Sequence, residues 1–225
     1  MNTMNTMNTM NTMNTMNTMN TMNTMNTMNT IKKMKTNILM DKNGMKIVKL
    51  TDNEYNVTFS IHNNQFILPS IINFDMVKLI FDLNPDIYEK AILKKNDALD
   101  NAFICSLMKD IYSDLGIPQS YVCMEVQMVK LSDVIKFRCE PLVNKTIPVE
   151  FSGISNLYLL PVKNLIIDCN ILTNHHIEID CKISIHVDVE IEPFIEKVIM
   201  TVVHKIFIRL KQFIESLTIN NSKVI

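Results

Sequence analysis

The residues with the clearest capacity for metal chemistry lie in one polar stretch of the chain, from His175 to Asp188. His175 and His176 are adjacent, and neighbouring side chains of a strand point to opposite faces, so they cannot both bind one ion unless a turn reorients them. His186 and Asp188 would share a face, but two ligands are too few for a closed metal site. We therefore expect no metal in this protein.

Acidic residues around the same stretch are the next candidates, because paired carboxylates can perform general acid–base catalysis. They are Glu178, Asp180, Asp188, Glu190 and Glu192. A catalytic carboxylate needs partial burial to tune its pKa, and a row of outward-facing acids in water does not provide it. The sequence also contains no Cys-x-x-Cys, His-Glu-x-x-His, Gly-x-Ser-x-Gly or P-loop motif. We therefore expect neither enzymatic activity nor a cofactor.

These polar residues alternate with apolar ones, and the alternation predicts the element that carries them. Every odd position from Ile177 to Ile191 is apolar, and every even position from Glu178 to Glu192, including Ser184, is polar. Strand side chains alternate between faces with a period of two. The pattern predicts one long antiparallel strand, Ile177 to Glu192, with an apolar inner face and a wet outer face.

At Pro193 the apolar period changes to three and four residues. Proline cannot donate to a strand ladder but fits the first turn of a helix, so a long amphipathic helix is predicted from there to Leu217. Its regular apolar positions are Ile195, Val198, Ile199, Val202, Val203, Ile206, Leu210, Phe213, Ile214 and Leu217. Phe194, Met200, Phe207 and Ile208 widen the apolar surface beyond one stripe, so part of it must contact something beyond the nearest side chains of the sheet.

The same two spacings of apolar residues, two for strands and three to four for helices, predict the elements in the rest of the chain. Strands are predicted at Met45 to Leu50, at Tyr55 to Ile61 in a hairpin with Gln65 to Leu68, and near residues 122–128, 135–139, 147–151, 158–160 and 165–171. Helices are predicted from an Asn73 N-cap to Leu83, from Pro85 to Leu93, and from Ala98 to Leu115 before Gly116-Ile117-Pro118. Short turns between the later strands favour an antiparallel meander.

This order of elements gives the fold class: α+β, with a curved antiparallel sheet wrapped on the long C-terminal helix. It resembles the START-like superfamily, the helix-grip fold shared with plant pathogenesis-related allergens and polyketide cyclases. The stretch Ile183 to Ile199 looks like the last strand, the proline-bearing connection and the start of the closing helix of that family. The resemblance covers about Tyr55 to Leu217, but the glycine-rich loop of the allergens is absent and the helix from Ala98 is longer than the pattern requires. No functional residue of the family can be carried over.

Large aliphatic residues on the sheet and on its covering helix leave two functions open. If sheet and helix stand apart, they enclose an apolar pocket for a lipid or sterol-like ligand, and the protein is a non-enzymatic intracellular binding module. The candidate cavity residues are Ile183, Ile185, Val187, Val202, Ile206 and Leu210. If they close tightly, those residues form only a core, and the protein is a structural or host-interaction protein without a ligand. The abundance of Ile, Asn and Lys favours an A/T-rich genome, and a large DNA virus is one such source.

The N-terminal segment has the composition of a tail. Residues 1–30 are ten copies of Met-Asn-Thr, with no apolar periodicity and almost no charge, so the segment cannot offset the entropy of ordering itself. We expect a disordered tail and linker over residues 1–44, with a turn at Asp41 to Gly44. A single domain is expected over residues 45–219 and a C-terminal tail over residues 220–225.

Composition limits the partners and the compartment. The net charge of −1 gives no reason to expect nucleic acid as a partner, because phosphate binding needs a concentrated basic surface. Charged residues interrupt the most apolar window, and no secretory signal is recognisable, so we expect no transmembrane segment and a cytoplasmic location, in the host if viral. In that compartment five widely spaced cysteines are expected to be small buried residues. The oligomeric state is left open.

Deletion of residues 1–30 tests the tail. Since the segment has no apolar face to contribute, the melting temperature of the shortened protein should equal that of the full chain within error. Differential scanning calorimetry measures both, and a fall of several degrees would show that the repeats pack on the domain.

Overall fold

The computed structural model describes residues 37–96, 100–110, 118–142, 151, 153–154, 157–186 and 191–218. Several predictions fall outside these ranges. They are the disordered tail of residues 1–30, the tail of residues 220–225, most of the strand predicted near residues 147–151, both ends of the helix predicted from Ala98, and residues 187–190 of the predicted long strand.

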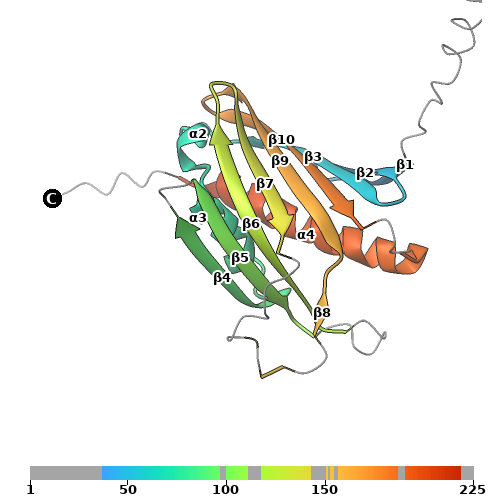
Figure 1. The fold of residues 1–225 in the computed structure, drawn as a ribbon. Coiled ribbons are helices and arrows are strands. Elements are labelled where there is room, and N and C mark those ends of the chain that lie inside the picture. The colour runs from blue at the N-terminus through green and yellow to red at the C-terminus, as the bar shows by residue number, and fades with distance from the viewer. Residues whose placement is uncertain are drawn as a thin grey trace, which may run out of the picture. The chain divides into compact units, whose positions relative to one another are not determined.

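The described residues form one ten-stranded sheet in the order β1-β2-β3-β10-β9-β7-β6-β5-β4, with β8 paired to β6 (Figure 1). The strands are β1 Asn37–Lys42, β2 Met45–Thr51, β3 Glu54–His62, β4 Tyr88–Asn96, β5 Asn101–Met108, β6 Ser120–Lys130, β7 Val134–Pro141, β8 Tyr158–Leu159, β9 Val162–Thr173 and β10 His176–Ile185. The β6–β8 contact is parallel. Every other pairing is antiparallel, as the short turns predicted.

The helices lie together on one side of the sheet (Figure 1). They are α2 Leu68–Ile71, α3 Phe74–Asp82 and α4 Pro193–Ser216. Asn73 caps α3 as predicted, because its side chain accepts hydrogen bonds from the backbone N–H groups of Asp75 and Met76. Pro193 begins α4, also as predicted.

The predicted long strand is shorter than its sequence pattern. β10 ends at Ile185, and His186 already lies outside the ladder, whereas the alternation continues to Glu192. The reason is the loss of partners: Ser184 faces the first residue of β3, and Ile185 faces the first residue of β9. The residue before β9 is Pro161, whose carbonyl accepts a hydrogen bond from the backbone N–H of His186 but which has no N–H of its own to continue the ladder.

Two predicted helices are wrong where the structure describes them. Residues of the predicted helix from Pro85 to Leu93 enter β4, and the middle of the one predicted from Ala98 is β5. β5 is apolar on both faces, since Ile104 faces one hydrophobic cluster while Cys105 and Leu107 face another that contains Phe151. A strand covered on both sides shows a continuous apolar run, which sequence periodicity cannot distinguish from a buried helix.

The N-terminal side of the sheet is also larger than predicted. Gln65 to Leu68 does not form a hairpin with β3, because α2 begins at Leu68 and the partners of β3 are β2 and β10. Residues 37–42, predicted as linker, form β1, which joins β2 through Asn43 and Gly44. Both turn residues have positive φ, 56° and 70°, the requirement of a two-residue turn whose twist matches a β-hairpin.

The cysteines divide into two groups. Cys139, Cys169 and Cys181 are free and buried, as predicted. Cys105 and Cys123 are buried as well, but they form a disulfide, which was not predicted from the sequence. They are Cα partners in the β5–β6 ladder. Their register could not be inferred while β5 was assigned to a helix.

Truncation on opposite faces of β10 tests the orientation of the strand. Ile179→Ala should lower the free energy of unfolding by about 2–5 kcal/mol, because Ile179 is buried in the core. Lys182→Ala is the control on the outer face and should change it by no more than about 0.5 kcal/mol. Urea denaturation measures both. Ser184, predicted to face water, is unsuitable as the control because it is buried.

Candidate apolar ligand site

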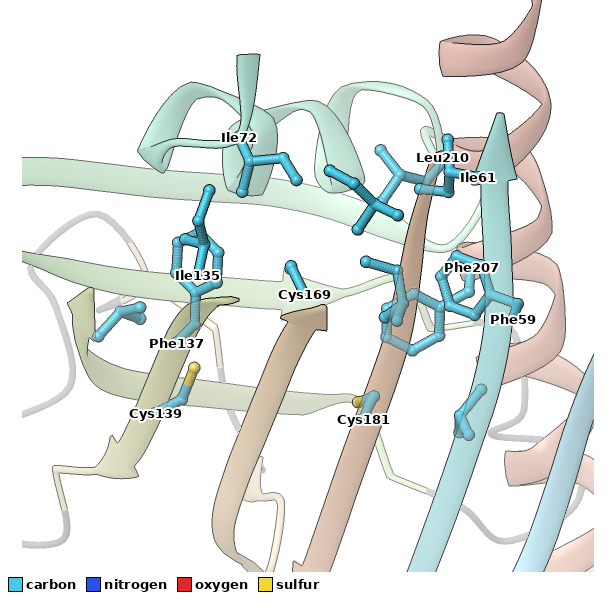
Figure 2. Close-up of a cluster of buried hydrophobic side chains, with 14 of the residues drawn as sticks. Phe59, Ile61, Ile72, Ile135, Phe137, Cys139, Cys169, Cys181, Phe207 and Leu210 are labelled. Carbon is cyan, nitrogen blue, oxygen red and sulfur yellow. The ribbon is translucent and has the colours of Figure 1, made fainter. Parts of the chain in front are cut away.

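The concave face of the sheet is an apolar floor. One row across it consists of Val57 on β3, Cys181 on β10, Ile167 on β9 and Phe137 on β7, which are successive partners in the ladders. The next row is Phe59, Ile179, Cys169 and Ile135 in the same order. Figure 2 shows several of these side chains directed toward the helices. The floor therefore offers aliphatic, aromatic and thiol groups only.

Helix α4 covers this floor with a stripe of buried residues at helical spacing: Met200, Phe207, Leu210 and Ile214. Phe207 contacts Phe59 on β3 with ring centroids 5.6 Å apart. The first turns of α4 pack less closely, because every residue from Pro193 to Ile199 is at least partly exposed and Phe194 is 58% exposed.

The structure brings some of the predicted cavity residues together and separates others. Ile185 and Leu210 belong to the core cluster, and Ile183 packs against it. Val202 and Ile206 are half-buried and lie outside this cluster, on the flank of α4 from which Arg209 reaches the turn between α3 and β4. Val187 lies outside the described residues.

A polar cluster that the sequence did not indicate fastens the beginning of α4 to β2 and β3. The Oε1 atom of Glu196 accepts hydrogen bonds from the Tyr55 hydroxyl at 2.7 Å and from Lys49 Nζ at 2.8 Å. Burial, reinforced by the bond to Glu196, raises the pKa of Tyr55 well above its ordinary value. Burial also acts to raise the pKa of Glu196, but the bonds from Lys49 and Tyr55 outweigh it, and the net pKa is lowered.

The middle and the end of α4 have their own polar contacts. Arg209 and Lys205 bind Asp86, which follows α3, and their hydrogen bonds hold the pKa of Asp86 well below its usual range. Asn63 Nδ2 donates to the backbone oxygens of Ile214 at 2.7 Å and Leu217 at 3.0 Å. No local pattern reveals these contacts, because each joins residues more than a hundred positions apart.

The chemistry available on the floor is limited. Burial raises the pKa of Cys139 and Cys169 to about 12 and that of Cys181 well above its ordinary value, so these thiols stay protonated at neutral pH. A thiol without its thiolate is a poor nucleophile and a poor metal ligand. Within the described ranges, no three His, Cys, Asp or Glu residues lie close enough to hold a metal ion.

Side chains of the floor and of α4 belong to one hydrophobic cluster of the described residues. The two best-defined pockets of that part of the chain lie elsewhere. One is a groove of about 380 Å³ between α3 and β4, bordered by Asp75, Lys78, Phe81 and Leu93. The other, of about 280 Å³, lies along β4 and β5 beside Phe103 and Glu125. None of the predicted cavity residues lines either of them.

No helix in the part of the chain that the structure describes is both long enough and apolar enough to cross a bilayer.

Comparison with solved structures identifies the arrangement of sheet and helix. The lipid transfer and protein localization domain of human StarD13 (DLC2) aligns over 87% of this chain and 97% of its own, with a TM-score of 0.62 and 6% identity. Human STARD10 aligns over 80% and 72%, with a TM-score of 0.60 and 6% identity. A STAR-related lipid transfer protein from Xanthomonas axonopodis aligns over 80% and 98%, with a TM-score of 0.53 and 13% identity. No family model and no curated protein matches the sequence.

The lowered pKa of Glu196 predicts a pH-dependent contribution to stability. Since the folded-state pKa lies below the ordinary value of 4.5, the contribution is complete above that value and is lost as the pH falls through the folded-state pKa. Glu196→Gln should therefore lower the free energy of unfolding by about 1–3 kcal/mol at pH 7 and by less below pH 4. Denaturation at several pH values measures this. Glu140→Gln, an exposed site on β7, is the control, and an equal loss at all pH values would contradict the prediction.

Proposed function

We propose that this protein, which has the START-like helix-grip fold predicted from its sequence, is a non-enzymatic binding module for an apolar ligand of the lipid or sterol class. The observation that carries the proposal is the apolar floor: four adjacent strands present no charged side chain in the two rows described above. A ligand bound there would contact only apolar surface, which favours a molecule that is itself poorly soluble in water.

The ligand would lie between the floor and α4, near Ile183, Ile185 and Leu210. Val187, Val202 and Ile206 stay in the proposal as residues of the wall. The first two turns of α4 offer the least resistance to an entering ligand, because none of their residues is fully buried. The contact of Glu196 with Lys49 and Tyr55 opposes that opening. Entry at the beginning of α4 is therefore the route that the packing favours.

Binding without catalysis is supported by the state of the polar groups near the floor. The thiols are kept protonated by burial, and the carboxylate of Glu196 already accepts two hydrogen bonds. A catalytic acid or base needs a partner on the substrate and a pKa near the working pH, and these groups have neither.

One observation favours the other function, a structural or interaction protein without a ligand. Phe59, Phe207 and Leu210 belong to one hydrophobic cluster between the floor and α4, and the two best-defined pockets of the described residues lie outside it. If side chains fill that space completely, they form only a core. In that case the protein would act through its surface.

Titration with a fluorescent fatty acid and a fluorescent sterol distinguishes the two functions. A binding module should give saturable binding with one site per chain. Leu210→Ala, which enlarges the space under α4, should change the affinity for these probes at least threefold and cost less than the roughly 2–5 kcal/mol of a packed core. Leu172→Ala, at an exposed site on β9, is the matched control and should change neither quantity.

A protein without a ligand site should give the opposite results. If neither probe saturates the wild-type protein and Leu210→Ala costs the full core penalty, the site is a filled core and the binding function is excluded. Extraction of the protein purified in its native state, followed by mass spectrometry, gives a second measurement. A copurified lipid in wild type and in Leu172→Ala, reduced in Leu210→Ala, supports the proposal.

A further inference from the structure

Two histidines that are distant in the sequence meet on the outer face of the sheet. His62 is the last residue of β3 and His176 is the first residue of β10, and the two are Cα partners in the ladder between these strands. Their imidazole rings are stacked, with centroids 3.7 Å apart and an angle of 28° between the planes. The two rings lie on the face opposite the apolar floor, because strand side chains alternate and the neighbouring Ile61 and Ile177 belong to the core.

One nitrogen of the pair lacks a hydrogen-bond partner. His176 Nε2 is buried and forms no hydrogen bond. An unpaired buried polar atom normally costs free energy, so such an atom in a folded protein requires an explanation. A neutral imidazole carries one nitrogen with a free lone pair, the form in which histidine binds metal ions. A bound cation at His176 Nε2 would therefore satisfy this atom.

We propose that His62 and His176 form a two-imidazole site for a late first-row transition-metal ion, of which Ni²⁺ and Zn²⁺ are the test cases, and that the bound ion links β3 to β10. His62 is exposed. Its ring can therefore rotate from the stacked position until a nitrogen of each ring faces one ion, since the terminal torsion of histidine is broad. This site is independent of the apolar ligand proposed above and lies on the other side of the sheet.

The charges around the pair permit a cation. Glu178 lies on the same face of β10, two residues from His176, and is exposed. The ammonium group of Lys211 donates to the Ser60 carbonyl and to Glu215. Glu215 also accepts a hydrogen bond from the backbone N–H of His62. The adjacent His175 is already engaged, because its Nδ1 contacts the carbonyl oxygens of Asn63 and Phe66.

The number and the type of the ligands determine which metal ions the site can bind. Among the residues that the structure describes, no third His, Cys, Asp or Glu completes the set, so water must supply the remaining ligands. Imidazole nitrogen suits nickel, copper and zinc, whereas calcium and magnesium require oxygen ligands. The site should thus bind an ion reversibly and prefer Ni²⁺ and Zn²⁺ to Mg²⁺.

Calorimetric titration of the full chain with Ni²⁺ tests the site. Wild type should bind one Ni²⁺ per chain, and His62→Ala and His176→Ala should each weaken binding at least tenfold. His186→Ala is the matched control, since ten residues of strand place His186 about 33 Å from His176, and it should bind as wild type does. His62→Gln, with a side chain of similar length and no imidazole, repeats the test if the alanine variant does not fold.

A second measurement separates a bridging ion from one held by a single residue. Ni²⁺ should raise the melting temperature of wild type and of His186→Ala, and should leave that of both single variants unchanged. Wild type that binds no Ni²⁺ at millimolar concentration would overturn the proposal. So would a His62→Ala/His176→Ala double variant that keeps wild-type affinity, or the loss of binding in only one of the two single variants.

Discussion

Burial of the concave face of β3, β10, β9 and β7 against α4 is the interaction on which the rest of this structure depends. These central strands place an apolar side chain at every second position, and the opposite face is mostly polar. A sheet of this kind cannot leave its apolar face in water, because each buried aliphatic side chain contributes about 1.5–3 kcal/mol that would otherwise be lost. α4 is the longest helix of the described chain, and its buried stripe lies on this face.

The polar contacts of α4 fix the position of this helix on the sheet. Apolar burial has no direction, so it does not fix where a helix lies along a sheet. Glu196 joins the start of α4 to Lys49 and Tyr55, Arg209 joins its middle to Asp86, and Asn63 binds its last carbonyl groups. Hydrogen bonds depend on distance and angle, and these three contacts therefore set the position that packing leaves undetermined.

The apolar burial under α4 also relates the fold to its proposed function. A domain that binds an apolar molecule in its core must exchange side-chain contacts for ligand contacts of similar energy. The part of α4 from Met200 onward contains its buried residues and can keep the domain folded while the first turns, which bury less, give way. The outer face of the sheet does not take part in this apolar packing. The stacked histidines meet on that face because β3 and β10 remain paired as far as the last residue of β3 and the first residue of β10.

The sequence by itself determined the elements whose periodicity is local. The strands around Phe59, Val126, Phe137, Ile167 and Ile179, the cap at Asn73 and the start of α4 at Pro193 each depend on residues within a few positions. Their order was enough to predict a curved antiparallel sheet on a long helix and the START-like resemblance. The inward position of Ile183, Ile185 and Leu210 was predicted for the same reason, since an alternating strand and a helical stripe each show which face is apolar.

Only the tertiary structure decided what depends on partners distant in the chain. β5 has apolar residues on both faces because Phe151 and its neighbours cover the outer one, and no local pattern shows such a cover. The end of β10 is set by where β3 and β9 begin. The disulfide depends on the register between β5 and β6. The position of Val202 and Ile206 on the flank of α4 depends on how this helix packs on the floor. Glu196 with Tyr55, and His62 with His176, are separated by more than a hundred residues. Such pairs meet only when the chain has folded, because their proximity is a property of strand pairing and helix packing rather than of sequence spacing.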